Sequence, residues 1–302
     1  MKNRISVIFV ILAGAFWGSS CLFVSRLSAL GFTPLQCTAI RIFIGALILN
    51  AALVIKGKGF ELYRVSLVSL GLAAASGICS VLAMCVFYYY CMTMTGAAVS
   101  AILLYTAPVF VMIMSVAFLG ERITPKKIAA FAVAIVGCAL VSGAASGVTV
   151  NAVGVLCGVL SGFAYSLYGI LTSLYMKRNS EPLAFSALSF AFAAVGALLL
   201  ASPVGIVQRA SAIEGVGALT LILLFVVFSL CTSVIPYVLY TVGLVGVRPD
   251  VASILAFSEP LTAALFGIAV LRQPFDLWQG VGIAFVVTAI VILNISFARK
   301  KK

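Results

Sequence analysis

The sequence predicts an all-α membrane protein, with ten transmembrane helices in two inverted five-helix repeats and both termini cytoplasmic. Three observations lead to this fold: the apolar composition, the distribution of basic residues among loops, and an internal repeat. Hydrophobic residues make up 64% of the 302 residues and charged residues only 9%, against roughly 25% charged in a typical globular domain. Polar side chains cannot cover a water-exposed surface here, so we expect lipid to surround most of the chain.

Ten apolar runs approach the length of ~20 residues that a helix needs to cross ~30 Å of hydrocarbon. The first run follows Lys2 and Arg4 as in a signal peptide, but it continues to Val24, which favours an uncleaved helix. The third and eighth runs are long enough to be tilted or broken. The ten predicted spans cover residues 5–25, 33–55, 66–90, 97–119, 127–142, 153–175, 183–201, 218–244, 251–271 and 277–295.

Basic residues gather on one side of this arrangement. With a cytoplasmic amino terminus, fifteen of the nineteen Lys and Arg residues fall in cytoplasmic segments. Only Arg26, Arg209 and Arg272 fall on the opposite side, and Arg41 lies inside a span. This bias follows the positive-inside rule, and an error of one span would destroy it. The fifteen are Lys2, Arg4, Lys56, Lys58, Arg64, Arg122, Lys126, Lys127, Lys177, Arg178, Arg248, Arg299, Lys300, Lys301 and Lys302.

The two halves of the chain resemble each other. An offset of 152 residues aligns segment 99–108 with segment 251–260, with identical Val, Ile, Leu and Pro and with Tyr105 on Phe257. The predicted repeats are 5–142 and 153–295, followed by a basic cytoplasmic tail at 296–302. Five spans per repeat invert the second copy, and inverted repeats build secondary transporters with a substrate site near the midplane. A purely structural bundle made by duplication is the alternative.

Two charged residues, Arg41 and Glu259, lie well inside predicted spans. A charge at the centre of a membrane helix costs at least ~2.5 kcal/mol, so each is a candidate for substrate binding or coupling. A low dielectric favours the neutral form of a carboxyl group, which suits a proton carrier. Alternatively, Glu259 caps backbone groups near Pro260, or pairs with Arg41 to hold the halves together. The sequence does not show whether Arg41 and Glu259 touch.

Prolines and aromatic residues supply further candidates. Pro108 and Pro260 occupy equivalent places in the fourth and ninth spans, where each is expected to kink its helix and to free the carbonyl four residues back. Tyrosine and tryptophan combine apolar bulk with a polar group, which suits a cavity for small amphipathic molecules. Among the aromatic residues we expect Trp17, Tyr105 and Tyr168 to bind substrate; others belong to interfacial belts.

Four motifs support a resemblance to a known family. They are Trp17-Gly18-Ser19-Ser20, Arg41, Leu119-Gly120-Glu121-Arg122-Ile123-Thr124-Pro125 and Glu259-Pro260. In these motifs, and over nearly its whole length as two tandem EamA domains, the sequence resembles the EamA-type members of the drug/metabolite transporter superfamily. The second half has Leu271-Arg272-Gln273-Pro274 where the family often repeats Gly-Glu. The resemblance implies a ten-helix transporter, often an exporter of amino acids or other small metabolites.

These observations favour a secondary active transporter rather than an enzyme. The chain has no histidine, which excludes a Ser-His-Asp triad, and no nucleotide-binding motif, which favours gradient-driven transport. We expect export by alternating access, with proton antiport as the favoured energy source; an importer or a multidrug efflux carrier is the alternative within this fold. A membrane scaffold and an intramembrane enzyme are alternatives from other classes.

The expected partners are few. We expect a small-molecule substrate and the lipid of the cell (plasma or inner) membrane, with no nucleic acid, because no basic patch is interleaved with stacking aromatics. No cofactor and no metal site is expected, since the eight cysteines show no C-x-x-C spacing. Small residues along spans five and ten permit close helix contact, within the protein or between two copies, so a homodimer stays open.

Overall fold

The computed structural model describes residues 2–57, 61–141, 151–178, 181–272 and 277–299, and these residues form helices without any strand. Eight of the helical segments are long and apolar enough to cross a membrane. The helical, membrane-spanning part of the prediction is therefore confirmed. The eight segments are Arg4–Ala29, Pro34–Lys56, Leu67–Thr95, Val99–Leu119, Ala152–Met176, Pro182–Ala201, Ala218–Gly243 and Pro249–Ala269.

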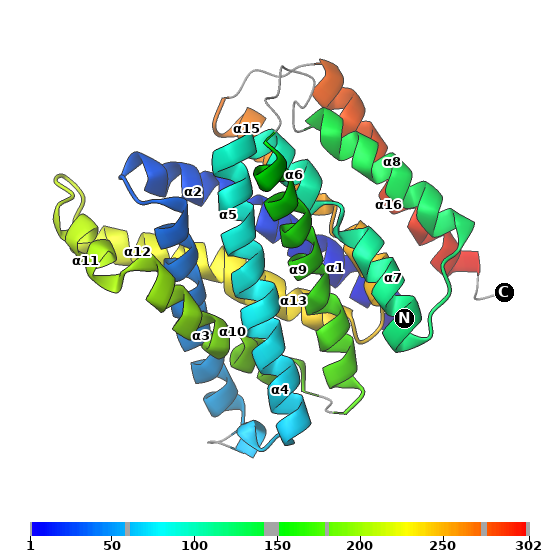
Figure 1. Cartoon of the computed structure of the whole chain (residues 1–302), viewed down its shortest axis with the longest axis horizontal. Helices are drawn as coiled ribbons and strands as arrows, with labels where there is room; N and C mark the ends of the chain where they lie inside the picture. Colours follow the sequence, from blue (N-terminus) through cyan, green and yellow to red (C-terminus); the bar gives the residue numbers. More distant parts are fainter. Residues whose placement is uncertain (1, 58–60, 142–150, 179–180, 273–276, 300–302) are drawn as a thin grey trace.

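The helices form one bundle (Figure 1), and five of the ten predicted spans consist of more than one helical element. The elements of the first half are α1 Lys2–Gly18, α2 Ser20–Ala29, α3 Pro34–Lys56, η1 Glu61–Tyr63, α4 Leu67–Ala75, η2 Ser76–Leu82, α5 Ala83–Thr95, α6 Ala97–Leu104, α7 Ala107–Leu119 and α8 Pro125–Val141. Those of the second half are α9 Ala152–Met176, α10 Pro182–Ala201, α11 Pro203–Ser211, α12 Ala218–Ser229, η3 Leu230–Val234, α13 Ile235–Gly243, α14 Pro249–Leu255, α15 Ser258–Ala269 and α16 Leu277–Arg299.

The predicted fifth and tenth spans correspond to α8 and α16. Helix α8 has 17 residues, and the apolar described part of α16 is Gly280–Ile292, so neither counts among the eight long segments. The two helices pack along each other at one edge of the bundle (Figure 1). The count of ten spans therefore stays a prediction. Residues 300–302, which belong to the predicted basic tail, lie outside the described part of the chain.

Local sequence explains where several helices begin. Thr33 and Gln36 form a capping box at the start of α3, since each side chain bonds the backbone N–H of the other. Pro34 then occupies the first turn, where its missing N–H costs nothing. Asn151 caps α9 by accepting from two backbone N–H groups, and Glu181 caps α10 ahead of Pro182.

The two long predicted spans each contain a π-helical segment. Segment η2 lies between α4 and α5, and segment η3 lies between α12 and α13. The offset of 152 residues places Leu230–Val234 on residues 78–82, inside η2. π turns occur mostly inside α-helices and frequently at functional sites. The two halves of the chain therefore carry this feature at equivalent positions.

The first helix of each half packs against helices of the other half. Helix α1 contacts α13 and α15, and helix α9 contacts α5, α6 and α7. Glycine makes these contacts close: a Cβ on Gly14 would lie 3.0 Å from the Ala256 carbonyl oxygen, and one on Gly162 would lie 3.2 Å from the Leu104 carbonyl oxygen. Both contacts are backbone to backbone, so a side chain at either glycine would separate the helices.

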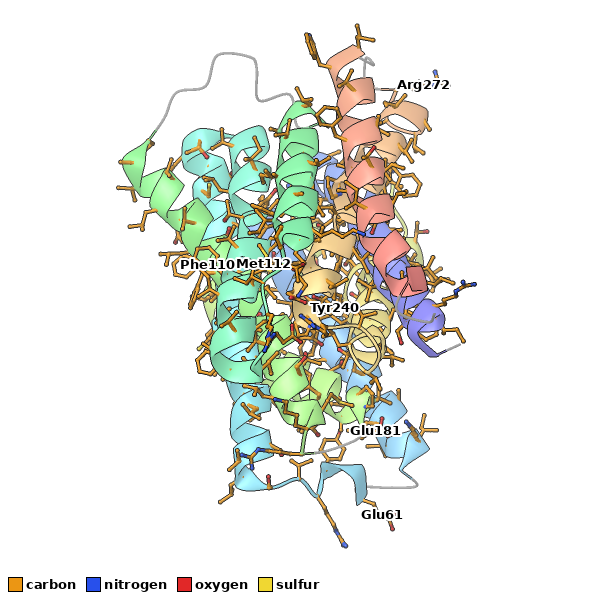
Figure 2. All side chains as sticks on the ribbon, turned by 90° about the vertical axis from the view of Figure 1, so that its right-hand side faces the viewer. Glu61, Phe110, Met112, Glu181, Tyr240 and Arg272 are labelled. Carbon is orange, nitrogen blue, oxygen red and sulfur yellow. The ribbon has the colours of Figure 1, made fainter. Side chains whose placement is uncertain are left out.

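Charged residues lie at both ends of the bundle. Glu61 and Glu181 lie at one end of the molecule, and Arg272 lies at the other (Figure 2). At the end with Glu181, the Lys56 ammonium group lies 2.8 Å from the Glu181 carboxylate and links α3 to α10. Phe110, Met112 and Tyr240 lie between the two ends (Figure 2).

Substituting Gly18 by alanine should destabilise the fold. The new Cβ would lie 2.8 Å from Thr262 Cβ and 2.9 Å from the Ala263 backbone nitrogen of α15, so we expect a loss of about 1–3 kcal/mol from overpacking. Gly71→Ala is the matched control, because a Cβ there meets nothing within 4 Å and alanine favours helix by up to about 1 kcal/mol. Thermal unfolding in detergent measures both, and equal melting temperatures for the two variants would contradict the close contact.

Candidate functional site

A cavity of about 220 Å³ lies among helices of both halves. Its wall combines two opposite charges with aromatic rings, hydroxyl groups, thiols and thioethers. Pro34, the first residue of α3, and Val24 of α2 belong to the wall, so the cavity extends to the side of the bundle where α2 meets α3. The residues that line it are Trp17, Ser20, Val24, Pro34, Cys37, Thr38, Arg41, Met84, Cys85, Tyr88, Tyr89, Met92, Ala101, Leu104, Tyr105, Tyr165, Phe228, Thr232, Tyr237 and Glu259.

Arg41 is held in the wall by neutral groups. Its guanidinium donates to Cys85 Sγ at 2.8 Å, to the Thr232 carbonyl oxygen at 3.4 Å and to Ser233 Oγ at 3.5 Å. Thr232 and Ser233 belong to the π segment η3. Because all three acceptors are uncharged, the positive charge of Arg41 stays available to an anionic group in the cavity.

Glu259 lies in the first turn of α15, where the helix dipole favours a negative charge. Its side chain lines the cavity and forms no hydrogen bond or ion pair with the described residues. The backbone at Glu259 is fixed from behind, because Gly18 of α1 packs directly on its carbonyl oxygen. Arg41 and Glu259 therefore share one cavity, and no ion pair within 4.0 Å joins these two described residues.

Trp17 and Tyr105, two of the three aromatic candidates, line the cavity. Trp17 packs edge-on against Tyr237, with ring centroids 5.2 Å apart. Tyr105 packs on Phe257 at 5.3 Å, and these two residues occupy equivalent positions of the repeat. Tyr105 thus lines the cavity, and its repeat equivalent Phe257 is buried behind it.

Tyr168 lies behind the cavity wall rather than in it. Its hydroxyl group is 2.9 Å from Thr241 Oγ1 and 3.3 Å from Ser186 Oγ, and its ring contacts Tyr237 at 4.9 Å. Only 5% of the residue is exposed. Tyr168 therefore supports Tyr237, whose ring reaches the cavity.

Sequence reasoning missed several residues of the wall. Tyr165, Tyr237 and Tyr88 are aromatic residues of the expected spans, but nothing in their spacing distinguishes them from Tyr90, which is 48% exposed outside the cavity. The sequence also gives no sign that Cys85 contacts Arg41. A π segment shifts the register of the following helix, and no sequence signal located it.

The helices that contain Pro108 and Pro260 are interrupted just before these residues. Helix α6 ends at Leu104 and α7 begins at Ala107, while α14 ends at Leu255 and α15 begins at Ser258. The carbonyl of Ala256, expected to be free, accepts from the Glu259 backbone N–H at 2.9 Å. This carbonyl therefore accepts a hydrogen bond from the next helix and is not free.

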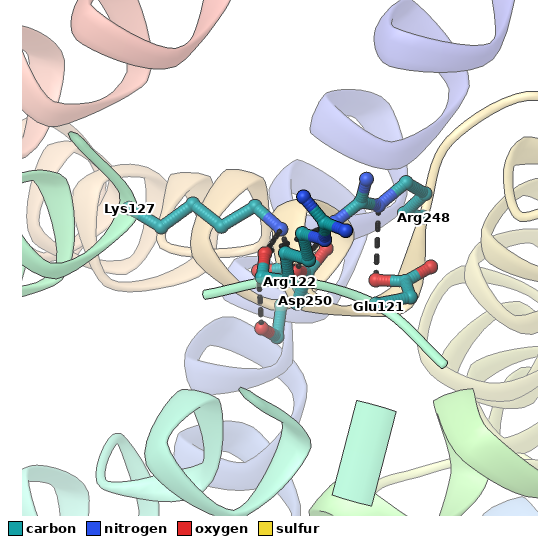
Figure 3. A network of polar contacts seen from close by, with 6 residues as sticks. Glu121, Arg122, Lys127, Arg248 and Asp250 are labelled. Carbon is teal, nitrogen blue, oxygen red and sulfur yellow. Dashed lines mark hydrogen bonds and ion pairs between the residues drawn. The ribbon is translucent and has the colours of Figure 1, made fainter. Parts of the chain in front are cut away.

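A second polar site, the ionic cluster, consists of Glu121, Lys127, Arg248 and Asp250 (Figure 3). Lys127 pairs with Asp250, and Arg248 lies 2.9 Å from Glu121 and 3.3 Å from Asp250. The Lys127 ammonium group also donates to the Arg122 carbonyl oxygen at 3.1 Å. Burial and the negative charge of Asp250 raise the pKa of Glu121, against the opposing effect of Arg248.

These features define a multi-pass membrane protein with a charged internal cavity. Two matches to the EamA-like transporter family, over residues 4–143 and 152–295, cover most of the sequence, and the chain belongs to this family.

Similar proteins are named as transporters. The chain is 27% identical over 303 residues to the uncharacterized transporter YwfM of Bacillus subtilis (strain 168), a match that covers 100% of this chain and 97% of that protein. It is 28% identical over 209 residues to an uncharacterized transporter of Archaeoglobus fulgidus, covering 66% of this chain and 67% of that relative. A protein of known crystal structure shares the fold, with a TM-score of 0.78, 18% identity and coverage of 97% and 98% of the two chains.

Removing the hydroxyl group of Tyr168 should affect stability, and removing that of Tyr105 should affect binding. Tyr168→Phe loses two hydrogen bonds, although Ser186 and Thr241 still bond each other at 3.2 Å, so we expect a loss of about 1 kcal/mol. Tyr105 makes no side-chain hydrogen bond to the described residues, and Tyr105→Phe should leave the melting temperature unchanged while altering KM. Thermal unfolding and initial transport rates separate the effects; the reverse assignment would contradict this geometry.

The pH dependence of stability should contain a contribution from Glu121. The pKa of Glu121 is raised in the folded protein. The folded protein therefore binds the proton of this carboxyl group more tightly than the unfolded chain does. Stability from this group therefore falls as the pH rises from the ordinary glutamate pKa of about 4.3 through the raised value. The melting temperature measured from pH 4 upward checks this, with Glu121→Gln flattening that part of the profile and Glu61→Gln, in an exposed segment, leaving it unchanged. A parent-like profile for Glu121→Gln would exclude the contribution.

Proposed function

We propose that the protein is a secondary active transporter that exports small metabolites such as amino acids by alternating access. In this proposal ten spans form two inverted repeats, 5–142 and 153–295, with both termini on the cytoplasmic side of the cell membrane. Family membership supports transport. Substrate, direction and coupling are proposed from the geometry of the cavity.

The packing of the halves supports the inverted repeat. Gly14 approaches the Ala256 carbonyl and Gly162 approaches the Leu104 carbonyl, and the two carbonyls are separated by the repeat offset of 152 residues. Both π segments and both helix interruptions also occur at equivalent positions. Two similar halves in opposite orientations can exchange conformations, which exposes a shared cavity to one side and then to the other.

The observation that carries the proposal is that Arg41 and Glu259 line one cavity without pairing. The guanidinium of Arg41 suits a substrate carboxylate, and the carboxylate of Glu259 suits a substrate ammonium group. Trp17 and Tyr237 provide an apolar and aromatic wall between them. This combination fits a free amino acid with an apolar side chain.

Glu259 also fits a role as proton carrier. It is the acidic residue of the cavity wall, and no ion pair within 4.0 Å joins it to a cationic side chain of the described residues. Protonation would remove the negative charge that attracts the ammonium group, so proton and substrate would compete for one site. Competition of this kind is what antiport requires.

Counterflow in liposomes tests the proposed transport. Purified protein should exchange labelled phenylalanine or leucine for an excess of the same unlabelled amino acid, with saturation. Arg41→Met should raise KM at least tenfold, because it removes the group proposed to bind the carboxylate. Cys37→Ala, in the same wall, is the control and should leave KM within about twofold. Absence of counterflow for every proteinogenic amino acid would refute the amino-acid assignment.

Proton coupling has its own test at Glu259. Glu259→Gln retains the size and polarity of the side chain but cannot release a proton. In vesicles we expect this variant to lose pH-gradient-driven accumulation while counterflow without a gradient persists with weakened affinity. Full proton-driven activity in Glu259→Gln would exclude this residue as the carrier.

A further inference from the structure

The ionic cluster connects the two halves of the chain at one place. Glu121 lies in the loop between α7 and α8, and Lys127 lies in the first turn of α8. Arg248 and Asp250 lie at the start of α14 in the second half. The pairs Lys127–Asp250 and Arg248–Glu121 both cross between these segments (Figure 3). Separating the segments would therefore break both ion pairs.

The cluster lies away from the cavity along the helices that line it. Tyr105 lines the cavity at the junction of α6 and α7, and Glu121 follows the end of α7, roughly 24 Å further along at 1.5 Å per residue. Glu259 lines the cavity in α15, and Asp250 precedes it by nine residues, or roughly 13 Å. The cluster thus lies beyond the cavity wall, on the side away from α2.

Equivalent half-helices differ in exposure at these two ends. Every residue of α14, Pro249–Leu255, is buried. Its equivalent in the first half, α6, contributes Ala101 and Leu104 to the cavity wall, and Ala101 is partly exposed. The α6 side therefore takes part in the cavity wall, whereas α14 is buried along its whole length.

The four charged residues of the cluster correspond to uncharged residues at the equivalent positions of the repeat. The repeat offset of 152 residues places Arg248 on Gly96 and Asp250 on Ala98, and it places Glu121 on Gln273 and Lys127 on Gln279. All four equivalents are uncharged. The buried pair Lys127–Asp250 resists separation because an unpaired buried charge is costly. Among the described residues, no ion pair lies at the end of the molecule with Arg272.

We propose that the ionic cluster of Glu121, Lys127, Arg248 and Asp250 holds the cytoplasmic end of the pathway closed, so that the transporter rests with its cavity open to the outside. The inference rests on the proposed topology and alternating access. Opening to the cytoplasm requires the cluster to separate, whereas no ion pair between described residues stabilises closure of the outer end. The cluster therefore sets the balance between the two conformations.

Cysteine accessibility at two equivalent positions tests this role. Ala101→Cys reports on the open end, and Ser253→Cys, in the buried helix α14, reports on the closed end. Labelling by a membrane-impermeant maleimide, quantified on the peptide that carries the substitution, is measured in intact cells and in inside-out vesicles. With the cluster intact, Ala101→Cys should label from outside and Ser253→Cys should resist labelling from inside.

Asp250→Asn should raise the labelling rate of Ser253→Cys from inside roughly tenfold or more, and it should lower that of Ala101→Cys from outside. Lys56→Gln is the control, because it breaks an exposed ion pair at the end with Glu181 and should change neither rate. Arg248→Gln provides an independent route if Asp250→Asn does not fold, as judged by size-exclusion chromatography.

Unchanged labelling of Ser253→Cys in a folded Asp250→Asn or Arg248→Gln variant would overturn the proposal. The readout does not depend on transport: a shift in labelling without amino-acid counterflow would support the cluster and refute the substrate assignment. Counterflow without a shift would do the opposite.

Discussion

The close contact between α1 and α15 is the constraint on which the site depends. Gly14 and Gly18 leave no side chain between the two helices, so the backbone of the Ala256–Glu259 segment lies directly against α1. Ser258 Oγ donates to the Ile11 carbonyl at 2.8 Å and ties the same segment to α1. This contact fixes the direction of Glu259 and brings Trp17 to the same wall. The same arrangement, with Gly162 against Leu104, holds the first half.

Opposite charges can remain inside this bundle because each has a different kind of support. Arg41 donates hydrogen bonds to uncharged acceptors from α5 and η3. Glu259 lies in the first turn of α15, where the helix dipole favours its negative charge, and it lines the cavity. A direct ion pair would have neutralised both charges and left an inert cross-link. Because the pair is not formed, the cavity keeps two separate points of attachment.

The helical class, the placement of Arg41 and Glu259 and the equivalence of Tyr105 and Phe257 could be predicted from sequence, because each is a signal along the chain: an apolar run, a charge within it, or an offset. Which tyrosine faces the cavity could not be predicted. Tyr237 follows the π segment η3 and packs on Trp17, while Tyr168 of α9 packs behind it, and the extra residue of a π turn leaves no mark in composition. The ionic cluster was missed for a different reason: Lys127 and Arg248 read as loop charges, and their partners lie far away in sequence.

The π segments η2 and η3 have a mechanical consequence. Such a turn holds one residue more than an α turn, so moving the extra residue along the helix would rotate the intervening part by about 100°. In η3 this rotation would carry the Thr232 carbonyl away from Arg41 without melting the helix. Each half thus contains a π segment that allows part of a helix to rotate. In the second half, this rotation would release or restore the hydrogen bond from the Arg41 guanidinium while both ends of the helix keep their places.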